Sequence, residues 1–360
     1  MLCVCFCIVL SLRIYSFARY GRFSDEGKKA TTDLAGGYFG CLLQLCGDLD
    51  YNARWLGLPR WSNHAKPCAL CMATFRGPLS WTDNRPSALW ISSCLTIANW
   101  RAYCETECEI FDLPGMSGLS VAMDYMRNMF LGWLQYLYGS VFYLLVHVIL
   151  PGEALENLTA IGEFITNFQD ENYTEHKYSH RLDKLSMFMK KSGYPKLRGK
   201  AVDIRGLDKT MLTLWSKHMH VTDRAHRQIR LALDLNVRIA SILNDFHPRD
   251  GYMAVPAPHC NQLKDIALQM AQLHNQLLEH FVTCEVKVFN MTSKTHFALH
   301  SLLLAQHIHP YLIWCFKGED MMRKTGVLWK SCLTGTKHWG VSIKAAVKYR
   351  LGMRIRFQDV

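Results

Sequence analysis

One long apolar stretch, residues 121–150, constrains the fold of this chain more than any other feature. It reads VAMDYMRNMFLGWLQYLYGSVFYLLVHVIL, and from Asn128 to Leu150 it contains no Lys, Arg, Asp or Glu. Its apolar positions cover all faces of a helix, so the sequence predicts a helix that is buried on most sides. About 20 apolar residues can also span a bilayer, which leaves a membrane anchor as the alternative. Gln135 and His147 dilute the run and favour burial inside a large protein domain.

Charge is distributed unevenly along the chain. Residues 181–360 contain 28 Lys and Arg against 13 Asp and Glu, a net of +15, whereas residues 1–180 contain 13 against 17, a net of −4. A basic half of this kind predicts contact with nucleic acid or another anionic surface, and a solvated basic domain is the plain alternative. Basic side chains can follow a phosphate backbone without reading the bases. The candidate nucleic-acid-binding residues are Lys190, Lys191, Lys196, Arg198, Lys200, Arg323, Lys324 and Lys330.

Cysteine spacing predicts a structural metal site. The chain has 14 Cys, and they include the pairs Cys68-x-x-Cys71 and Cys104-x-x-x-Cys108. Because no convincing secretion signal is present, we expect reduced thiols. Two pairs of thiolates can complete a four-coordinate zinc site. The alternative for the second pair is two solvent-facing thiols on an acidic turn.

Three acidic positions are candidates for catalysis. Asp48 ends an apolar run within residues 34–58, which fits a strand that delivers a carboxylate to its C-terminal edge, but Gly-Asp is ordinary turn chemistry and we favour the turn. Asp124 opens the apolar stretch of residues 121–150, where helix amides can stabilise negative charge. Glu319 and Asp320 precede a basic segment, and either could be aimed at a metal or simply open a helix.

Apolar residues at helical spacing predict further helices. One of them carries His296 and His300 one turn apart, which is metal-ligand spacing, but without a nearby acid we favour an ordinary core helix. Thr222 is the expected N-cap of another helix. The predicted helices are residues 153–169, 208–219, 222–244 and 260–284 and the two-His segment within 285–309.

Four segments in this order resemble CACTA-type (En/Spm-like) transposases. GDLDYNARWLGLPRW–CALC at 47–71 is similar to the segment in which the second Asp is followed by Cys-x-x-Cys, and MDYMRNMFLG at 123–132 to the Asp-x-Met-His-x-x-x-Leu-Gly motif. FNMTSKTHFALHSLLL at 289–304 resembles the two-His helix, and WCFKGEDMM at 314–322 the segment of the final Glu. YPKLRGKA and KYRLGMRIRF look like a large uncharacterised transposon-derived group. The similarity covers roughly residues 35–357.

The resemblance implies a mainly α fold with a small α/β part: a degenerate ribonuclease-H-like core that carries a large helical insertion. It implies Mg²⁺ or Mn²⁺ as cofactor, a nuclear protein, and DNA as the partner that is cut and joined. By carry-over, Asp48 is the second catalytic carboxylate, Asp124 the acid of the Asp-x-x-His motif, and Glu319 the last metal ligand, with Asp320 in reserve.

Two departures from the family pattern predict an inactive nuclease. Arg127 stands where the motif has His, and a guanidinium can neither ligate a metal nor shuttle a proton near neutral pH. The first catalytic Asp has no credible position, because Asp25 and Asp33 lie in or beside a linker. A two-metal mechanism without a shared ligand loses most of its rate. We therefore expect a transposon-derived DNA-binding protein that is truncated at its N-terminus.

The expected domains are an unassigned start (1–33), a partial ribonuclease-H-like and zinc-binding segment (34–120), a helical insertion (121–310) and a final helix with a basic tail (311–360). Two other classes remain open: a membrane protein anchored by residues 2–18 and 129–150, and a zinc-stabilised interaction module without a DNA role. The chain has no P-loop, G-x-G-x-x-G or G-x-S-x-G, so nucleotide hydrolysis and serine-hydrolase chemistry have no support, and no small-molecule substrate is evident.

Overall fold

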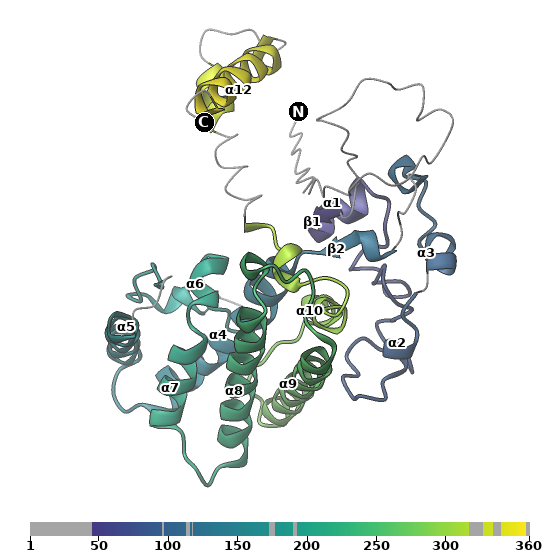
Figure 1. Ribbon diagram of the computed structural model, residues 1–360. Helices are drawn as coiled ribbons and strands as arrows, with labels where there is room; N and C mark the ends of the chain where they lie inside the picture. The colour runs from purple at the N-terminus through teal and green to yellow at the C-terminus, as the bar shows by residue number, and fades with distance from the viewer. Residues whose placement is uncertain are drawn as a thin grey trace, which may run out of the picture. The chain divides into compact units, whose positions relative to one another are not determined.

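The computed structural model describes residues 45–95, 97–112, 116, 118–172, 177–189, 193–316, 327–333 and 340–357 (Figure 1). The described residues divide into two units, residues 45–314 and residues 315–357, which are treated separately below. The described residues are mostly helical, with two short strands, so the predicted mainly α class is confirmed.

The two strands run parallel and each is followed directly by an aspartate. β1 (Leu45–Gly47) pairs with β2 (Val121–Met123), with Gly47 opposite Met123. Because the strands are parallel and in this register, Asp48 and Asp124 leave the same edge of the sheet. The turn favoured at Gly47-Asp48 is therefore corrected, because the alternative, a strand that ends directly before Asp48, is present. Residues 121–123 were expected to be helical, and they form β2 instead because the helix begins only after Asp124, whose carboxylate accepts a hydrogen bond from the Met126 N–H at 3.1 Å.

The apolar stretch forms a continuous helix from Met126 to Ile149. It is π-helical over η4 (Met126–Leu134), α-helical over α4 (Gln135–Leu144) and π-helical again over η5 (Leu145–Ile149). In the described part of the chain it is the one helix long and apolar enough to cross a membrane. However, 83% of its most apolar 18-residue segment is buried inside the protein. Its burial agrees with the expected core helix.

Polar groups of this helix bond to other segments of the protein. Ser140 Oγ accepts a hydrogen bond from the Phe289 N–H at 2.7 Å. The Tyr138 hydroxyl accepts one from Asn236 Nδ2 at 3.0 Å, and the Gln135 carbonyl accepts one from the Leu197 N–H at 2.9 Å. A buried polar group is stable only when it is bonded, and these bonds also fix the register of the helix against its neighbours.

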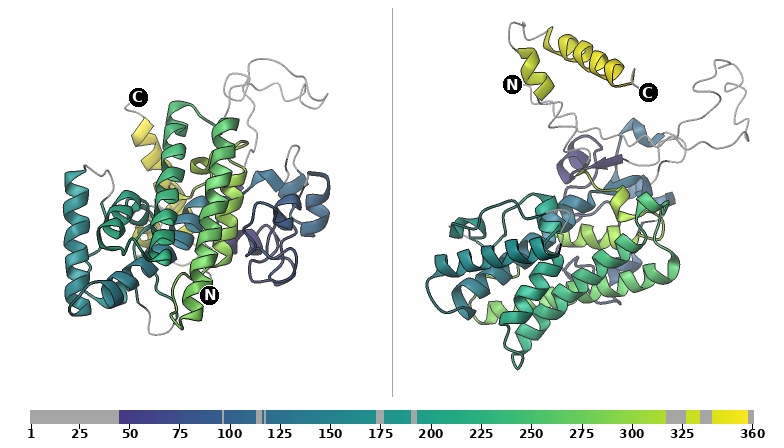
Figure 2. Two further views of the ribbon diagram at one scale, coloured as in Figure 1. Left: turned by 90° about the horizontal axis from the view of Figure 1, so that it is seen from below. Right: turned by 60° about the vertical axis from the view of Figure 1, so that its left-hand side comes forward.

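Helices surround the central one, and several begin or end near their predicted bounds. α8 and α9 lie side by side over much of their length (Figure 2), and α10 packs against both α9 and η4. In Figure 1, α2 and α3 lie to the right of α10, with α5 to α8 to its left.

The predicted N-cap Thr222 is corrected to Asp223, whose carboxylate accepts from the His226 N–H at 3.0 Å. The remaining elements of this unit are α1 (Leu49–Arg54), α2 (Leu89–Ser92), α3 (Ile97–Cys104), η2 (Glu109–Asp112), η3 (Gly118–Ser120), α5 (Ala154–Glu171), η6 (Leu185–Met187), α6 (Ala201–Arg205), α7 (Asp208–His218), α8 (Arg224–Asp245), η7 (Pro248–Asp250), α9 (Ala257–Thr283), α10 (Ser293–Leu303) and η8 (Pro310–Leu312).

Gly139 lets an extended segment approach the central helix closely. A Cβ at this position would lie 2.7 Å from the backbone N and Cα of Lys196. We expect Gly139→Ala to lower the free energy of unfolding by about 1–3 kcal/mol, because backbone on both sides must shift. Urea denaturation measures the change. The matched control is Gly162→Ala on α5, where the nearest atom is Leu182 Cβ at the wider separation of 3.3 Å and Ala is the better helix former. Equal effects of the two substitutions would contradict the close approach.

His274 on α9 should make the fold sensitive to acid. Its Nδ1 accepts a hydrogen bond from Trp133 Nε1 at 3.1 Å, so the proton of the neutral ring is on Nε2, which donates to the Phe289 carbonyl at 3.0 Å. Burial lowers the pKa of His274 from 6.5 to about 4. The unfolded chain therefore binds the proton first as the pH falls. Stability is complete above pH 6.5 and decreases by roughly 3 kcal/mol as the pH falls through 4. Chemical denaturation across this range should show a shallower pH dependence for His274→Gln but not for His280→Gln, which changes an exposed His of the same helix.

The second unit is described by a short helix at 327–333 and by α12 (Val341–Phe357). Cys332, Val341 and Ala345 form its small buried cluster. Lys348 Nζ donates to the Ser331 hydroxyl at 3.1 Å. Lys330 is exposed on the short helix, as a nucleic-acid-binding residue needs to be.

Candidate functional site

Two thiols and two imidazoles meet in a buried cluster. Cys68 and Cys71 lie on the segment between α1 and α2, while His296 and His300 lie one turn apart on α10. Cys68 Sγ is 3.5 Å from His300 Nε2, and Cys71 Sγ is 3.4 Å from His296 Nε2. His300 Nε2 is 3.2 Å from both Cys71 Sγ and His296 Nε2. All four ligand atoms lie within 4.8 Å of one another.

The cluster fits a tetrahedral metal such as zinc. Zinc–sulfur bonds of about 2.3 Å and zinc–nitrogen bonds of about 2.0–2.1 Å place ligand atoms roughly 3.3–3.8 Å apart at tetrahedral angles. The separations of 3.2 and 3.4 Å between Cys71 Sγ and the two imidazole nitrogens are close to this range. Two sulfur and two nitrogen donors with no open side are typical of structural zinc sites. In the described part of the chain, this is the one group of three or more such side chains that could hold a metal.

The charges within the cluster favour the thiolate form of Cys68, which is the form that binds a metal. Burial raises the pKa of Cys68, but a hydrogen bond with Cys71 and the charges of His300 and His296 outweigh burial and hold that pKa well below its usual value. Burial and the neighbouring Cys68 raise the pKa of Cys71. Burial by itself would lower the pKa of His300. The negative charge of Cys68 outweighs burial and raises this pKa to about 10. A metal ion would displace these protons, since thiolate and neutral imidazole are the binding forms.

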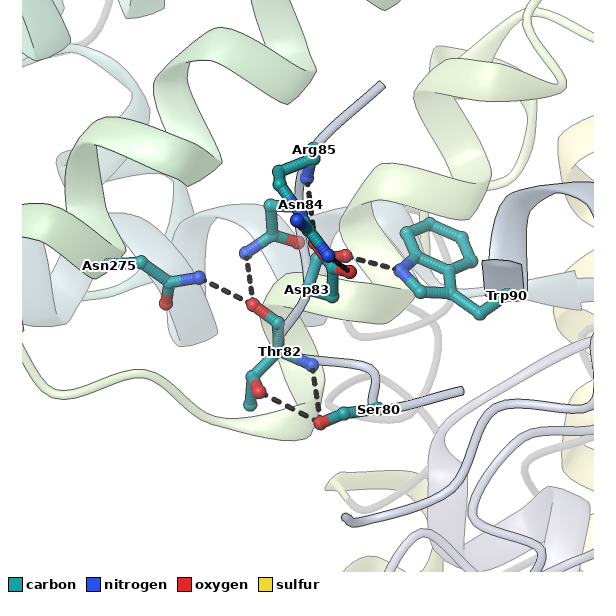
Figure 3. A network of polar contacts seen from close by, with 7 residues as sticks. All are labelled: Ser80, Thr82, Asp83, Asn84, Arg85, Trp90 and Asn275. Atoms are coloured by element: carbon teal, nitrogen blue, oxygen red, sulfur yellow. Dashed lines mark hydrogen bonds and ion pairs between the residues drawn. The ribbon is translucent and has the colours of Figure 1, made fainter. Parts of the chain in front are cut away.

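Trp90 covers the cluster and is held by its own polar network. Its ring meets those of His296 and His300 edge-on, with centroids 4.5 and 5.3 Å apart. Its indole N–H donates to the Asp83 carbonyl at 2.6 Å (Figure 3). In the same network, Asn275 on α9 donates to the Thr82 carbonyl, so the loop that leads into α2, the helix of Trp90, is tied to α9. The hydrophobic cover keeps water from the cluster, as a structural metal site requires.

Two of the four predicted metal ligands are in the cluster, and the other two are corrected. Cys68 and Cys71 are in the cluster, but Cys104 and Cys108 are not among its ligands, and His296 and His300 take their places. Cys104 is buried nearby, where its thiol donates to the Ala69 carbonyl at 3.6 Å. The interpretation of the two His as an ordinary core-helix pattern is corrected in turn. The spacing of the two His was the only local signal, because their Cys partners lie 225 and 232 residues away.

A cleft lined by both charged and apolar groups lies at the edge of the sheet from which the two aspartates leave. It has a volume of about 320 Å³. Both Asp48 and Asp124 line it, so the structure brings together two of the three predicted catalytic acids. The lining residues are Asp48, Leu49, Asp50, Trp61, Asp124, Arg127, Asn128, Tyr136, Lys196, Thr292, Ser293 and Lys294.

Arg127 and Lys294 place positive charge beside these acids. Arg127 Nε lies 3.3 Å from the buried carboxylate of Asp124. Lys294 Nζ donates to the Leu131 carbonyl at 3.4 Å. Burial and the charge of Arg127 lower the pKa of Lys294, while Asp124 and Asp48 oppose this change. The cleft is therefore lined by both acidic and basic side chains within a small volume.

Comparisons of the chain with protein-family models, with curated proteins and with solved structures found no match.

In the described residues, the cleft gives no support to the predicted Mg²⁺ or Mn²⁺ site. Such a site needs several oxygen ligands around one point, and Asp124 faces the guanidinium of Arg127 instead. Glu319 and Asp320 lie outside the described residues, as do Lys190, Lys191, Arg323 and Lys324.

Of the other predicted phosphate-binding residues, Lys196 lines the cleft. Arg198 and Lys200 are exposed on the segment that leads into α6. Lys294, Asn128 and Thr292 were missed, since only the packing of α10 against η4 brings them to the cleft.

Proposed function

We propose that this chain is a transposon-derived nucleic-acid-binding protein whose cleft holds the phosphate backbone without cutting it. One observation carries the proposal: a parallel strand pair delivers Asp48 and Asp124 to a cleft that also contains Arg127, Lys196 and Lys294. Carboxylates at adjacent strand ends are what a ribonuclease-H-like ancestor would leave behind, and the three cations suit phosphate.

Arg127 supports the loss of cleavage. Its guanidinium occupies the charge-compensating position beside Asp124 that a divalent cation would need. A cation fixed by the chain can bind phosphate, but it can neither activate water nor hold a leaving oxygen as a metal ion does.

The Cys₂His₂ cluster supports this function structurally. A zinc ion there would join the segment of Cys68 and Cys71 to α10, and the first turn of the same helix supplies Thr292, Ser293 and Lys294 to the cleft. Metal binding would thus hold the basic wall of the cleft in place without taking part in chemistry.

Titration of duplex DNA at several salt concentrations tests the binding. Removal of one cation that neutralises a phosphate should reduce the slope of log affinity against log salt by about 0.9. We expect the triple variant Arg127→Ala, Lys196→Ala, Lys294→Ala to reduce the slope by up to ~2.7 and the affinity by at least about tenfold. The matched control removes three exposed lysines outside the cleft: Lys209→Ala, Lys217→Ala, Lys287→Ala. Wild-type binding that is independent of salt would contradict a DNA role and favour a zinc-stabilised interaction module.

Plasmid nicking with Mn²⁺ tests the loss of cleavage. We expect no nicked product above the protein-free rate. Robust nicking that Asp48→Ala abolishes would overturn the inactive assignment, because it would show that the acids still hold a working metal.

A further inference from the structure

Two polar side chains in the cleft have no hydrogen-bond partner for their buried atoms. Asn128 on η4 is 1% exposed, and within the described structure neither its Oδ1 nor its Nδ2 is bonded. Thr292 stands at the start of α10, and its buried hydroxyl also lacks a partner there. Both residues line the cleft. A buried amide without a partner costs about 1–3 kcal/mol, so two such groups facing one cavity indicate a polar ligand.

The N-terminus of α10 opens into the same cleft. α10 is eleven residues long, and its N-cap residue Thr292 makes no side-chain capping bond. The first N–H groups of a helix have no acceptor within the helix, and the helix dipole places partial positive charge there. Thr292, Ser293 and Lys294 all line the cleft, so this end of α10 is suited to an anion.

Each of the three acids that line the cleft is engaged by a neighbouring donor, Asp124 by Arg127 and the Met126 N–H. Three acids and three bases line it, but Asp50 is paired at 2.9 Å with Arg54, which lies outside the lining. Asp48 is engaged as the cap of α1, where it accepts from the Tyr51 N–H at 2.8 Å. Among the described lining residues, the buried donors without a partner are the Asn128 amide and the Thr292 hydroxyl, whereas the Thr295 N–H of α10 already donates to the Thr292 carbonyl at 2.9 Å.

We propose that the cleft contains a subsite for one phosphate group, held by Asn128, Thr292, Lys294 and the N-terminus of α10. The proposal rests on the nucleic-acid-binding function above and names the atoms that would hold the backbone. Phosphate oxygens accept all four kinds of donor, and charge-assisted bonds of this type are the strong ones. The volume of about 320 Å³ suits one nucleotide rather than a longer stretch. Trp61 and Tyr136, both partly buried in the lining, offer aromatic surface for the attached base.

Binding of inorganic phosphate to the full chain, followed by calorimetry, tests the subsite. Asn128→Asp preserves the size of the side chain but turns a donor into a carboxylate, and Lys294→Gln removes the charge while leaving a polar group. We expect each change to weaken phosphate binding at least about tenfold, as loss of a bond to a charged group does. Asn167→Asp makes the same chemical change on the exposed face of α5 and should leave phosphate binding within about twofold. Circular dichroism confirms folding, and Lys294→Gln carries the test if Asn128→Asp does not fold.

Two single-stranded oligonucleotides separate the sources of the phosphate. A 5′-phosphorylated strand that binds more tightly than its 5′-hydroxyl form assigns the subsite to a terminal phosphate, whereas equal binding of the two, still weakened by Lys294→Gln, assigns it to an internal phosphodiester. No phosphate binding at about 10 mM, or equal binding by wild type and both variants, would overturn the subsite. Salt-dependent DNA binding that persists in that case would leave the nucleic-acid-binding function standing.

Discussion

Removal of the metal from the Cys₂His₂ cluster should lower the thermal midpoint of the metal-loaded protein by more than about 10 °C. The ligands join segments that are more than 200 residues apart, so the ion closes a long loop of the unfolded chain. Without it, two thiols and two imidazoles remain buried, and the fold is less stable by several kcal/mol. Calorimetric melting before and after chelation, with zinc added back, measures the effect.

Cysteine substitutions distinguish metal loss from general thiol chemistry. Cys71→Ser removes one predicted ligand and should reproduce most of the effect of the chelator. Cys284→Ser changes an exposed thiol beyond the end of α9 and should melt like the wild type. A chelator that leaves the midpoint unchanged, with Cys71→Ser equally stable, would show that the four side chains are only a buried polar cluster.

Trp90→Ala should cost about 3–5 kcal/mol of unfolding free energy. Trp90 is 0% exposed, and its loss would leave a cavity over both imidazoles and remove the bond to the Asp83 carbonyl. Water would then reach the metal ligands, so the variant should also release zinc more readily to a chelator. Urea denaturation and zinc release to a chromophoric chelator give the two readouts.

Trp55 offers the comparison within the same unit, because it follows α1 and is 57% exposed. Trp55→Ala should change stability by less than about 0.5 kcal/mol, as surface substitutions usually do. If Trp90→Ala is no more destabilising than Trp55→Ala, the indole does not cover the metal cluster as described.

Local sequence signals predicted the backbone around the site in part. The uncharged run after Asp124 predicted a buried helix, since this pattern depends on burial along one element. The apolar run that ends at Asp48 allowed a strand, but Gly-Asp favoured a turn, and only pairing with β2 decides for the strand. The boundary at 121–123 was wrong because three apolar residues fit a strand or a helix equally well. A hydrogen-bonded partner strand, β1, decided between the two.

The composition of the metal cluster could be predicted only in part. Cys68 and Cys71 are close in sequence, so their spacing alone indicated a metal site. His296 and His300 had the right spacing but no visible partner, because the fold brings them to the Cys pair from more than 200 residues away. Asn128 and Thr292 gave no signal, since an unbonded amide or hydroxyl exists only once helices are packed.

X-ray absorption spectroscopy at the zinc edge tests the central feature, the metal cluster, most directly. We predict one zinc ion per chain with two sulfur neighbours at about 2.3 Å and two nitrogen neighbours at about 2.0–2.1 Å. A shell of four sulfurs would contradict the cluster and return Cys104 and Cys108 to the ligand set, and a chain that binds no zinc would contradict the site altogether.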